Sequence, residues 1–199
     1  MPLHSPHHAL AFPRTPLTWV AACALVGCTP TLDWREVRPP GSQLLSLFPC
    51  KPSAQQRQVP LAGKPVLLTL HACVAGGQTW GLAMADVVDP ARVAPALVAF
   101  SVSAAANIGA APPGVAPFAA SLVTPIAVPG AVPFAVRGAT PHPDSQRLFL
   151  QGKLPDGTRV TMHAALFSHG TQVFRASVLG AQVSAEAADT FFDALRVQP

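Results

Sequence analysis

The apolar run Leu17–Cys28, near the N-terminus, constrains this chain more than any other stretch. A helix that crosses a bilayer needs about 20 apolar residues, whereas the apolar region of an export signal has about 7–15. The run has the shorter length and ends in small residues and a cysteine. We therefore expect residues 1–27 to be a signal peptide and the remaining chain to fold after export.

The end of this run, Leu25-Val26-Gly27-Cys28, resembles the lipobox of bacterial lipoproteins. In that motif an aliphatic residue and two small residues precede the cysteine that is diacylated and becomes the new N-terminus. Val20–Cys23 also fits the pattern but leaves almost no apolar region ahead of it, so Cys28 is the expected lipid anchor. An ordinary cleaved signal and a buried helix remain alternatives.

The lipobox resemblance also implies a location and a first partner. Acyl chains on Cys28 would hold the protein on a membrane, since each buried methylene contributes roughly 0.8 kcal/mol. The next residue is Thr29 and not Asp, so the inner-membrane retention signal of Gram-negative lipoproteins is missing. We therefore expect an outer-membrane lipoprotein that faces the periplasm.

Length and charge bound the rest of the chain. Removal of residues 1–27 from the 199-residue sequence leaves 172 residues, enough for one domain with a real core. We expect a tether at 28–37 and a single domain at 38–199. The formal net charge is +4 and falls to +3 without Arg14, with no cluster of Lys and Arg. Phosphate binding needs basic side chains gathered on one face, so nucleic acid is not an expected partner.

Two cysteines, Cys50 and Cys73, remain in the mature chain if Cys28 is lipidated and Cys23 leaves with the signal. Disulfides persist in the oxidising periplasm, so we expect these two to pair. The chain-entropy model assigns roughly 3 kcal/mol to a bridge across such a loop. Two free buried thiols, or a metal pair with His71 close by, are the alternatives.

Alternating and helical patterns predict the order strands, helix, irregular segment, strands, helix. Asp89-Pro90 and Gly109 are typical start and stop signals for the first helix, and Ser184 for the start of the second. Hairpin-linked strands with helices set apart indicate an α+β fold with an antiparallel sheet. The expected strands are Gln43–Phe48, Gln55–Leu61, Val66–Val74, Gln78–Val88, Arg147–Gln151, Thr158–Ser168 and Thr171–Leu179, and the first helix is Ala91–Ile108.

The segment 110–143 is rich in Ala, Pro, Val and Gly and carries a single charge, Arg137. Its prolines exclude a central strand or a long helix. We expect an irregular segment that lies over the sheet, with a short helix near Phe118–Leu122. A hydrophobic patch that meets the membrane or a partner is the alternative.

Four groups of side chains are candidates for binding. Trp80 and Met84 lie on the same face of their predicted strand, where they form either core packing or the wall of a ligand pocket. Metal binding is considered for His71, His163 and His169, although the register of the last hairpin leaves the facing of the latter two open. Asp189 and Asp193, four residues apart, can hold a cation or form a solvated acidic face.

Several sequence motifs resemble those of a group of uncharacterised proteobacterial lipoproteins. They are Phe48–Pro52, Ala106–Gly109, Gly152–Gly157 and Thr190–Arg196. The layout of that group is similar to the PsbP/Mog1-like sandwich, an antiparallel sheet with helices packed on it. The resemblance covers most of residues 35–197 and implies no catalytic residues and no cofactor. The proline-rich segment departs from the pattern of that fold.

Motifs with a known chemistry are missing from the sequence. It contains no C-x-x-C, H-E-x-x-H, S-x-x-K or G-x-S-x-G and no glycine-rich phosphate loop. We therefore expect a non-enzymatic binding or supporting module of the cell envelope, with an envelope protein as its partner. The alternatives are a small-molecule carrier with an apolar pocket near Trp80 and Met84, and a metal-binding protein.

Overall fold

The structure, a computed structural model, describes residue 1 and residues 31–110 and 130–199. These residues form an α+β fold with two antiparallel sheets, in agreement with the expected class. A seven-stranded sheet has the order β3-β4-β5-β9-β8-β7-β6, and a small sheet has the order β1-β2-β10. The strands are β1 (Arg35–Val37), β2 (Leu44–Phe48), β3 (Ser53–Leu61), β4 (Lys64–Ala75), β5 (Gln78–Asp86), β6 (Val132–Pro133), β7 (Gln146–Lys153), β8 (Arg159–His169), β9 (Gln172–Gly180) and β10 (Arg196–Val197).

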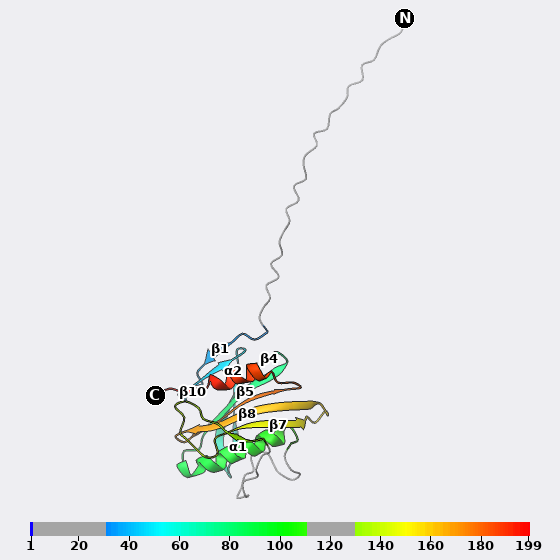
Figure 1. Ribbon diagram of the computed structural model, residues 1–199. Coiled ribbons are helices and arrows are strands. Elements are labelled where there is room, and N and C mark those ends of the chain that lie inside the picture. Colours follow the sequence, from blue (N-terminus) through cyan, green and yellow to red (C-terminus); the bar gives the residue numbers. More distant parts are fainter. Residues whose placement is uncertain (2–30, 111–129) are drawn as a thin grey trace.

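Three layers build the molecule (Figure 1). Helix α1 (Val93–Asn107) covers one side of the seven-stranded sheet, which we call the α1 face. Helix α2 (Ala185–Asp193) and the small sheet cover the other side, which we call the α2 face. Within the described residues, no helix is long and apolar enough to cross a bilayer.

Two tight turns set the register of the large sheet. Gly76 and Gly77 both have positive φ, 60° and 70°, and join β4 to β5 as the expected hairpin. Such two-residue turns match the twist of antiparallel strands and favour glycine. His169 pairs with Gln172, so the turn between β8 and β9 also has two residues. This register, which the sequence left open, directs His163 and His169 to the same α2 face.

Local signals define α1 as expected. The Asp89 side chain accepts a hydrogen bond from the N–H of Ala91, and the first turn is a 3-10 helix, η1 (Pro90–Arg92). Gly109, with φ of 62°, ends the helix in a Schellman pattern of hydrogen bonds. The C-terminal end then docks on β7, because the Lys153 N–H donates to the carbonyl of Ile108.

The α1 face is covered by small and aliphatic side chains. The predicted stripe of α1 is buried: Val93, Leu97, Phe100 and Ala104. The helix is buried beyond that stripe, including Ser101, so it has no wide polar side. The helix packs across β7, β8 and β9. Strands β3 and β4 have more exposed residues.

Helix α2 follows its predicted amphipathic pattern. Ser184 accepts a hydrogen bond from the N–H of Ala187 at the first turn. Phe191 and Phe192 are buried against the sheet, whereas Asp189 and Asp193 face outward. The apolar stripe therefore fixes how α2 lies on the sheet.

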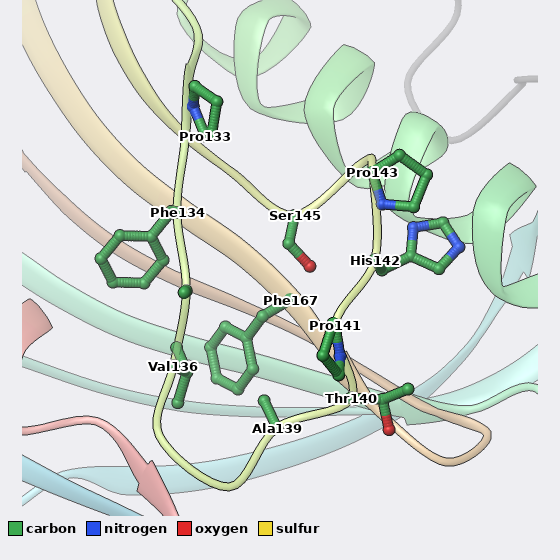
Figure 2. A pocket seen from close by; sticks show the side chains of 11 residues that line it. Pro133, Phe134, Val136, Ala139, Thr140, Pro141, His142, Pro143, Ser145 and Phe167 are labelled. Carbon is green, nitrogen blue, oxygen red and sulfur yellow. The ribbon is translucent and has the colours of Figure 1, made fainter.

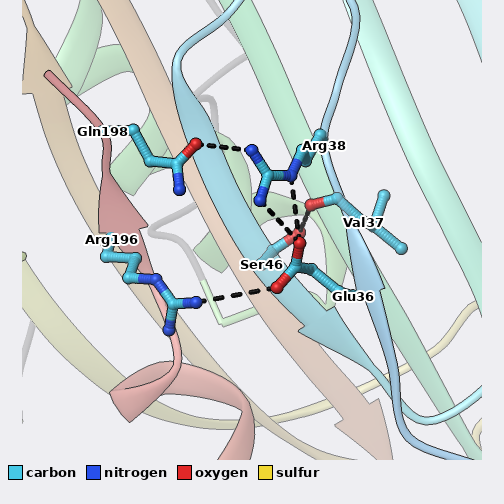
Figure 3. A network of polar contacts seen from close by, with 6 residues as sticks. All are labelled: Glu36, Val37, Arg38, Ser46, Arg196 and Gln198. Atoms are coloured by element: carbon cyan, nitrogen blue, oxygen red, sulfur yellow. Dashed lines mark hydrogen bonds and ion pairs between the residues drawn. The ribbon is translucent and has the colours of Figure 1, made fainter.

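The small sheet brings both ends of the described domain together (Figure 3). Glu36 accepts hydrogen bonds from Arg38 and lies 3.6 Å from a guanidinium nitrogen of Arg196. Arg38 also donates to the side-chain oxygen of Gln198 at 2.6 Å, and the Ser46 hydroxyl donates to the carbonyl of Val37. These contacts are solvent-exposed for the most part, so each contributes little to stability. Their effect is to align β1 with β10.

Two expected segments differ from, or lie outside, the described structure. The tether expected at 28–37 includes β1, so the fold begins before residue 38. Trp34 in that segment packs edge-to-face on Trp80, with ring centroids 5.7 Å apart. Of the irregular segment 110–143, residues 111–129 lie outside the described residues, and so does the short helix expected near Phe118–Leu122. The remainder contains β6, an edge strand, where proline is tolerated.

Candidate functional site

A pocket of about 450 Å³ lies where the chain between β6 and β7 curls back on itself. Residues 133–145, which we call the ring loop, form its rim, and Phe167 of β8 lies inside the ring (Figure 2). The lining residues are Pro133, Phe134, Ala135, Val136, Ala139, Thr140, Pro141, His142, Pro143, Ser145 and Phe167. We call this hollow the ring pocket. Its volume is within the range of about 300–1,000 Å³ that is common for small-molecule sites.

Backbone hydrogen bonds hold the ring loop in shape. The N–H of Phe134 donates to the carbonyl of Ser145 and closes the ring, and the N–H of Thr140 donates to the carbonyl of Ser168. At the tip, Gly138 has φ of 79°, and a Cβ there would lie 2.2 Å from the carbonyl oxygen of Val197. Only glycine fits this position. The loop is therefore fixed to both β8 and the C-terminal strand.

Two polar side chains stand among the apolar ones of the ring pocket. The Ser145 hydroxyl is buried, has no hydrogen-bond partner and points into the ring (Figure 2). His142 accepts from the N–H of Asp144 through Nδ1 at 3.1 Å. The N–H of Ser145 donates to the His142 carbonyl, but the Ser145 hydroxyl makes no hydrogen bond to the imidazole, as a nucleophile would to its base. The arrangement is that of an apolar binding pocket with a free hydroxyl.

A cation–aromatic cluster adjoins the ring loop on the α2 face. The Arg147 guanidinium lies 4.6 Å from the ring centroid of Phe192 and 5.2 Å from that of Phe149. It also donates to Asp189 at 2.7 Å. Asp189 therefore pairs with a cation of the chain itself and does not form a site with Asp193. His163 packs on Phe149, and burial, followed by the Arg147 charge, lowers its pKa below the usual 6.5.

The predicted disulfide is present. The Sγ atoms of Cys50 and Cys73 are bonded, and the two Cα atoms are 6.1 Å apart. Cys73 lies opposite Trp80 in the β4–β5 ladder, and Cys50 follows β2. The bridge therefore ties the small sheet to the seven-stranded sheet. The predicted lipid anchor, Cys28, lies outside the described residues.

Trp80 and Met84 lie in the packed core of the α2 face. Trp80 is 0% exposed and Met84 is 7% exposed. The Trp80 ring packs edge-to-face on Phe191, and its Nε1–H donates to the carbonyl of Ala75. Neither residue lines the ring pocket. Their positions match the packing interpretation of the Trp/Met stripe.

The three candidate metal-binding histidines occupy separate positions on the α2 face. His71 is 5% exposed in β4, where burial lowers its pKa, and its Nε2 has no partner. His169 lies beside a shallow polar depression at the β8–β9 turn, with Nε2 3.0 Å from Oε1 of Gln43. Among the described residues, His, Cys, Asp and Glu do not gather in threes at metal-binding distances.

The ring pocket and the Arg147 cluster were not foreseen from the sequence. Proline spacing marked the ring loop only as irregular, and the aromatic residue within it, Phe134, gave no separate signal. Arg147 meets Asp189 across 42 positions in the sequence, and only the packed structure joins them.

Comparison with known proteins places the chain in no family. No protein-family model and no curated protein matches it. A crystal structure of a protein from Bacteroides thetaiotaomicron VPI-5482 is similar at 11% sequence identity and a TM-score of 0.43. The similarity covers 84% of this chain and 50% of the other chain, so this chain spans about half the length of that protein.

Proposed function

We propose that this protein is a lipid-anchored periplasmic lipoprotein of the outer membrane, acting as a non-enzymatic binding or supporting module of the cell envelope. The observation that carries the proposal is the Cys50–Cys73 disulfide. Disulfides persist in oxidising compartments such as the periplasm and are rare in the cytosol. The export signal before Cys28 and the lipobox resemblance supply the route to that compartment and the anchor.

The proposal also includes membership of a lipoprotein group. The chain would be a member of the uncharacterised proteobacterial lipoproteins with a PsbP/Mog1-like sandwich. The antiparallel sheet, covered by α1 on one face and by α2 on the other, supports this layout. The partner would then be an envelope protein, met by a domain that the lipid holds at the membrane.

Intact mass of the membrane-extracted protein, before and after reduction, tests the anchor and the compartment together. We expect the mass of residues 28–199 plus acyl groups, and an increase of two hydrogens on reduction. The Cys28→Ala variant is the control, because it should lose the acyl mass and the membrane association but keep the disulfide. An unlipidated full-length mass, with no disulfide between Cys50 and Cys73, contradicts the proposal.

Activity assays and co-purification test the proposed non-enzymatic binding role. The purified domain should show no robust hydrolase or transferase activity, and it should be captured from detergent-solubilised envelope together with a defined protein. The Cys28→Ala variant, compared under the same conditions, separates capture by the domain from capture through shared lipid. A turnover activity that survives repeated purification would contradict the non-enzymatic proposal.

A small-molecule carrier is the second candidate function, and the ring pocket favours it. The pocket of about 450 Å³ combines an apolar lining with the buried, unpartnered hydroxyl of Ser145. Its position differs from the wall expected at Trp80 and Met84, which are packed in the core. Carrier function would therefore use the ring loop and not the centre of the sheet.

Filling the ring pocket tests the carrier function. Native mass spectrometry should detect a co-purified ligand in the natural protein and not in an Ala139→Leu variant, because Ala139 lines the pocket. Ala181→Leu, at an exposed position outside the ring loop, is the matched control and should retain the ligand. Equal ligand content in all three proteins would assign the ligand to another site.

A further inference from the structure

Arg175 holds a positive charge within the sheet on the α1 face. It lies in the middle of β9, opposite Ala83 of β5 and Leu166 of β8. Its Nη1 donates to the Ser103 hydroxyl at 2.7 Å, and its guanidinium carbon lies 5.6 Å from the ring centroid of Phe100. The residue is half-buried, and its Nε is shielded from solvent without a hydrogen-bond partner.

No carboxylate side chain of this protein balances that charge. All nine Asp and Glu residues fall within the described parts of the chain, because residues 2–30 and 111–129 contain none. None of the ion pairs that these carboxylates form includes Arg175. Shielded charges in proteins are normally paired, since an unpaired one loses hydration without compensation. The Asp and Glu side chains of the chain therefore leave Arg175 without a counter-ion.

A second cation stands on the same face. Gln55, Leu70, Ala83 and Arg175 lie opposite one another across β3, β4, β5 and β9, so their side chains share the α1 face. Arg57, two residues from Gln55, faces the same way. Burial and the positive charge of Arg57 lower the pKa of Arg175 to about 10, so Arg175 remains protonated at neutral pH. Two like charges on one face favour an anion between them.

Small residues lie beside Arg175 on the α1 face. Across β4, β5 and β9 the next row consists of Ala72, Gly81 and Ser177, which are small. Leu70 and Leu179 on either side of this row are only partly buried. An oxyanion at the guanidinium can therefore carry an apolar group that rests on these leucines.

We propose that Arg175 and Arg57 form a binding site for an oxyanion, a carboxylate or a phosphate, on the α1 face. With Nη1 engaged by Ser103 and Nε shielded from solvent, Nη2 of Arg175 remains for a charge-assisted hydrogen bond to an oxyanion. Arg57 supplies the second charge from the rim. This site lies on the opposite side of the sheet from the α2-face core and needs neither the lipid anchor nor the ring pocket.

Calorimetric titration of the purified natural protein with three probes tests the site. Decanoate offers a carboxylate on an apolar chain, inorganic phosphate offers a free oxyanion, and decyl maltoside, below its micellar concentration, offers the chain without charge. We expect saturable binding of decanoate or phosphate that weakens with added salt, and none of decyl maltoside at this site. Tighter binding of decanoate identifies an amphiphile as the source of the oxyanion, whereas equal or tighter binding of phosphate identifies a free anion.

Charge-removing variants assign the binding to these side chains. Arg175→Met and Arg57→Met should each weaken anion binding about tenfold or more, because each removes a charged hydrogen-bond donor. Arg159→Met, at an exposed position of β8, is the matched control and should bind as the natural protein does. Circular dichroism verifies the fold of each variant, and the exposed Arg57 position keeps the test valid if Arg175→Met unfolds.

Two results would overturn the proposal. One is the absence of saturable binding of both anions to the natural protein. The other is anion binding of unchanged affinity in both Arg175→Met and folded Arg57→Met. If Arg175 serves only to pin α1 to β9 through Ser103, the first of these results is expected, together with lower stability of Arg175→Met.

Discussion

The two faces of the seven-stranded sheet bury apolar surface in different ways. The α2 face holds the aromatic cluster of Trp80, Phe191 and Phe192 and is cross-linked at Cys50–Cys73. The α1 face is covered by a helix of alanine, serine and aliphatic residues. Large aromatic side chains stabilise a fold through the apolar area that they bury and the geometry of their ring pairs. Small side chains stabilise it by allowing the helix and the sheet to pack closely. The α2 face is therefore built for rigidity, and the α1 face tolerates a charge within it.

Two arginines show the same contrast. Arg147 on the α2 face stacks on two phenylalanines and pairs with Asp189. Arg175 on the α1 face stacks on Phe100 and bonds to a neutral hydroxyl. Nε is shielded without a hydrogen-bond partner in both, but only the first guanidinium has a carboxylate of the chain as its counter-ion. This difference is what separates a structural arginine from one available to a ligand.

Truncation of Trp80 should give the largest effect on stability. Trp80→Ala removes a 0%-exposed ring that packs on Trp34 and Phe191, and should lower the free energy of unfolding by about 3–5 kcal/mol. Urea denaturation followed by circular dichroism measures the change. Val74→Ala, at an exposed position of β4, is the control and should change little.

The same truncation on the α1 face sharpens the comparison. Leu97 is also 0% exposed, and Leu97→Ala should cost about 2–5 kcal/mol, generally less than the loss of the tryptophan. A Leu97→Ala cost clearly above that of Trp80→Ala would reverse the assignment of rigidity to the α2 face.

Loss of the disulfide should give the next largest effect. A Cys50→Ala/Cys73→Ala double variant should lose about 3 kcal/mol, because the bridge restricts a loop in the unfolded chain. Thermal unfolding of the natural protein with dithiothreitol should shift in the same direction. The variant itself should not respond to dithiothreitol, and a response there would show that another thiol is involved.

Local signals explain how much of this fold could be predicted from sequence. Asp89-Pro90, Gly109 and Ser184 act on their own neighbours, so the start and end of α1 and the start of α2 were predicted closely. Trp80 and Met84 were placed on one face by alternation within a single strand, which also needs no distant residue. Period and capping are properties of neighbouring residues, and sequence displays them directly.

The sites depend on distant pairings, which sequence does not display. Arg175 meets Ser103 across 72 positions, and their contact requires that α1 cross the sheet over β9. The facing of His163 and His169 required the register of the β8–β9 turn. The ring pocket required the closure of Phe134 on Ser145. Only the cysteine pair was predictable, because few cysteines remained to choose from.

Neutralising the two arginines should give smaller effects on stability, which differ between the two faces. Arg147→Met loses the contact with the exposed Asp189 and two aromatic stackings, together about 1 kcal/mol. Arg175→Met removes a charge with no counter-ion and should leave stability unchanged or slightly raised. Paired urea titrations at low salt measure both. A larger loss for Arg175→Met than for Arg147→Met would make Arg175 the structural arginine of the two.

The smallest expected effect is a pH dependence that arises on the α2 face. Burial lowers the pKa of His71 in the folded protein below the unfolded value of 6.5, and its shielded Nε2 has no partner. Below pH 6.5 the unfolded chain therefore binds more protons than the folded one. Stability should be fully present above pH 6.5 and decrease as the pH falls below it.

Substitution at His71 checks the source of that pH dependence. His71→Leu should flatten the change in unfolding free energy between pH 7.5 and pH 5 in urea titrations. His163, whose pKa is also lowered by burial and by Arg147, accounts for part of the remaining slope, so His163→Leu should flatten it as well. Both histidines lie on the α2 face, so the change of unfolding free energy with pH arises from that face of the sheet. An unchanged slope in the double variant would assign the pH dependence to groups outside that face.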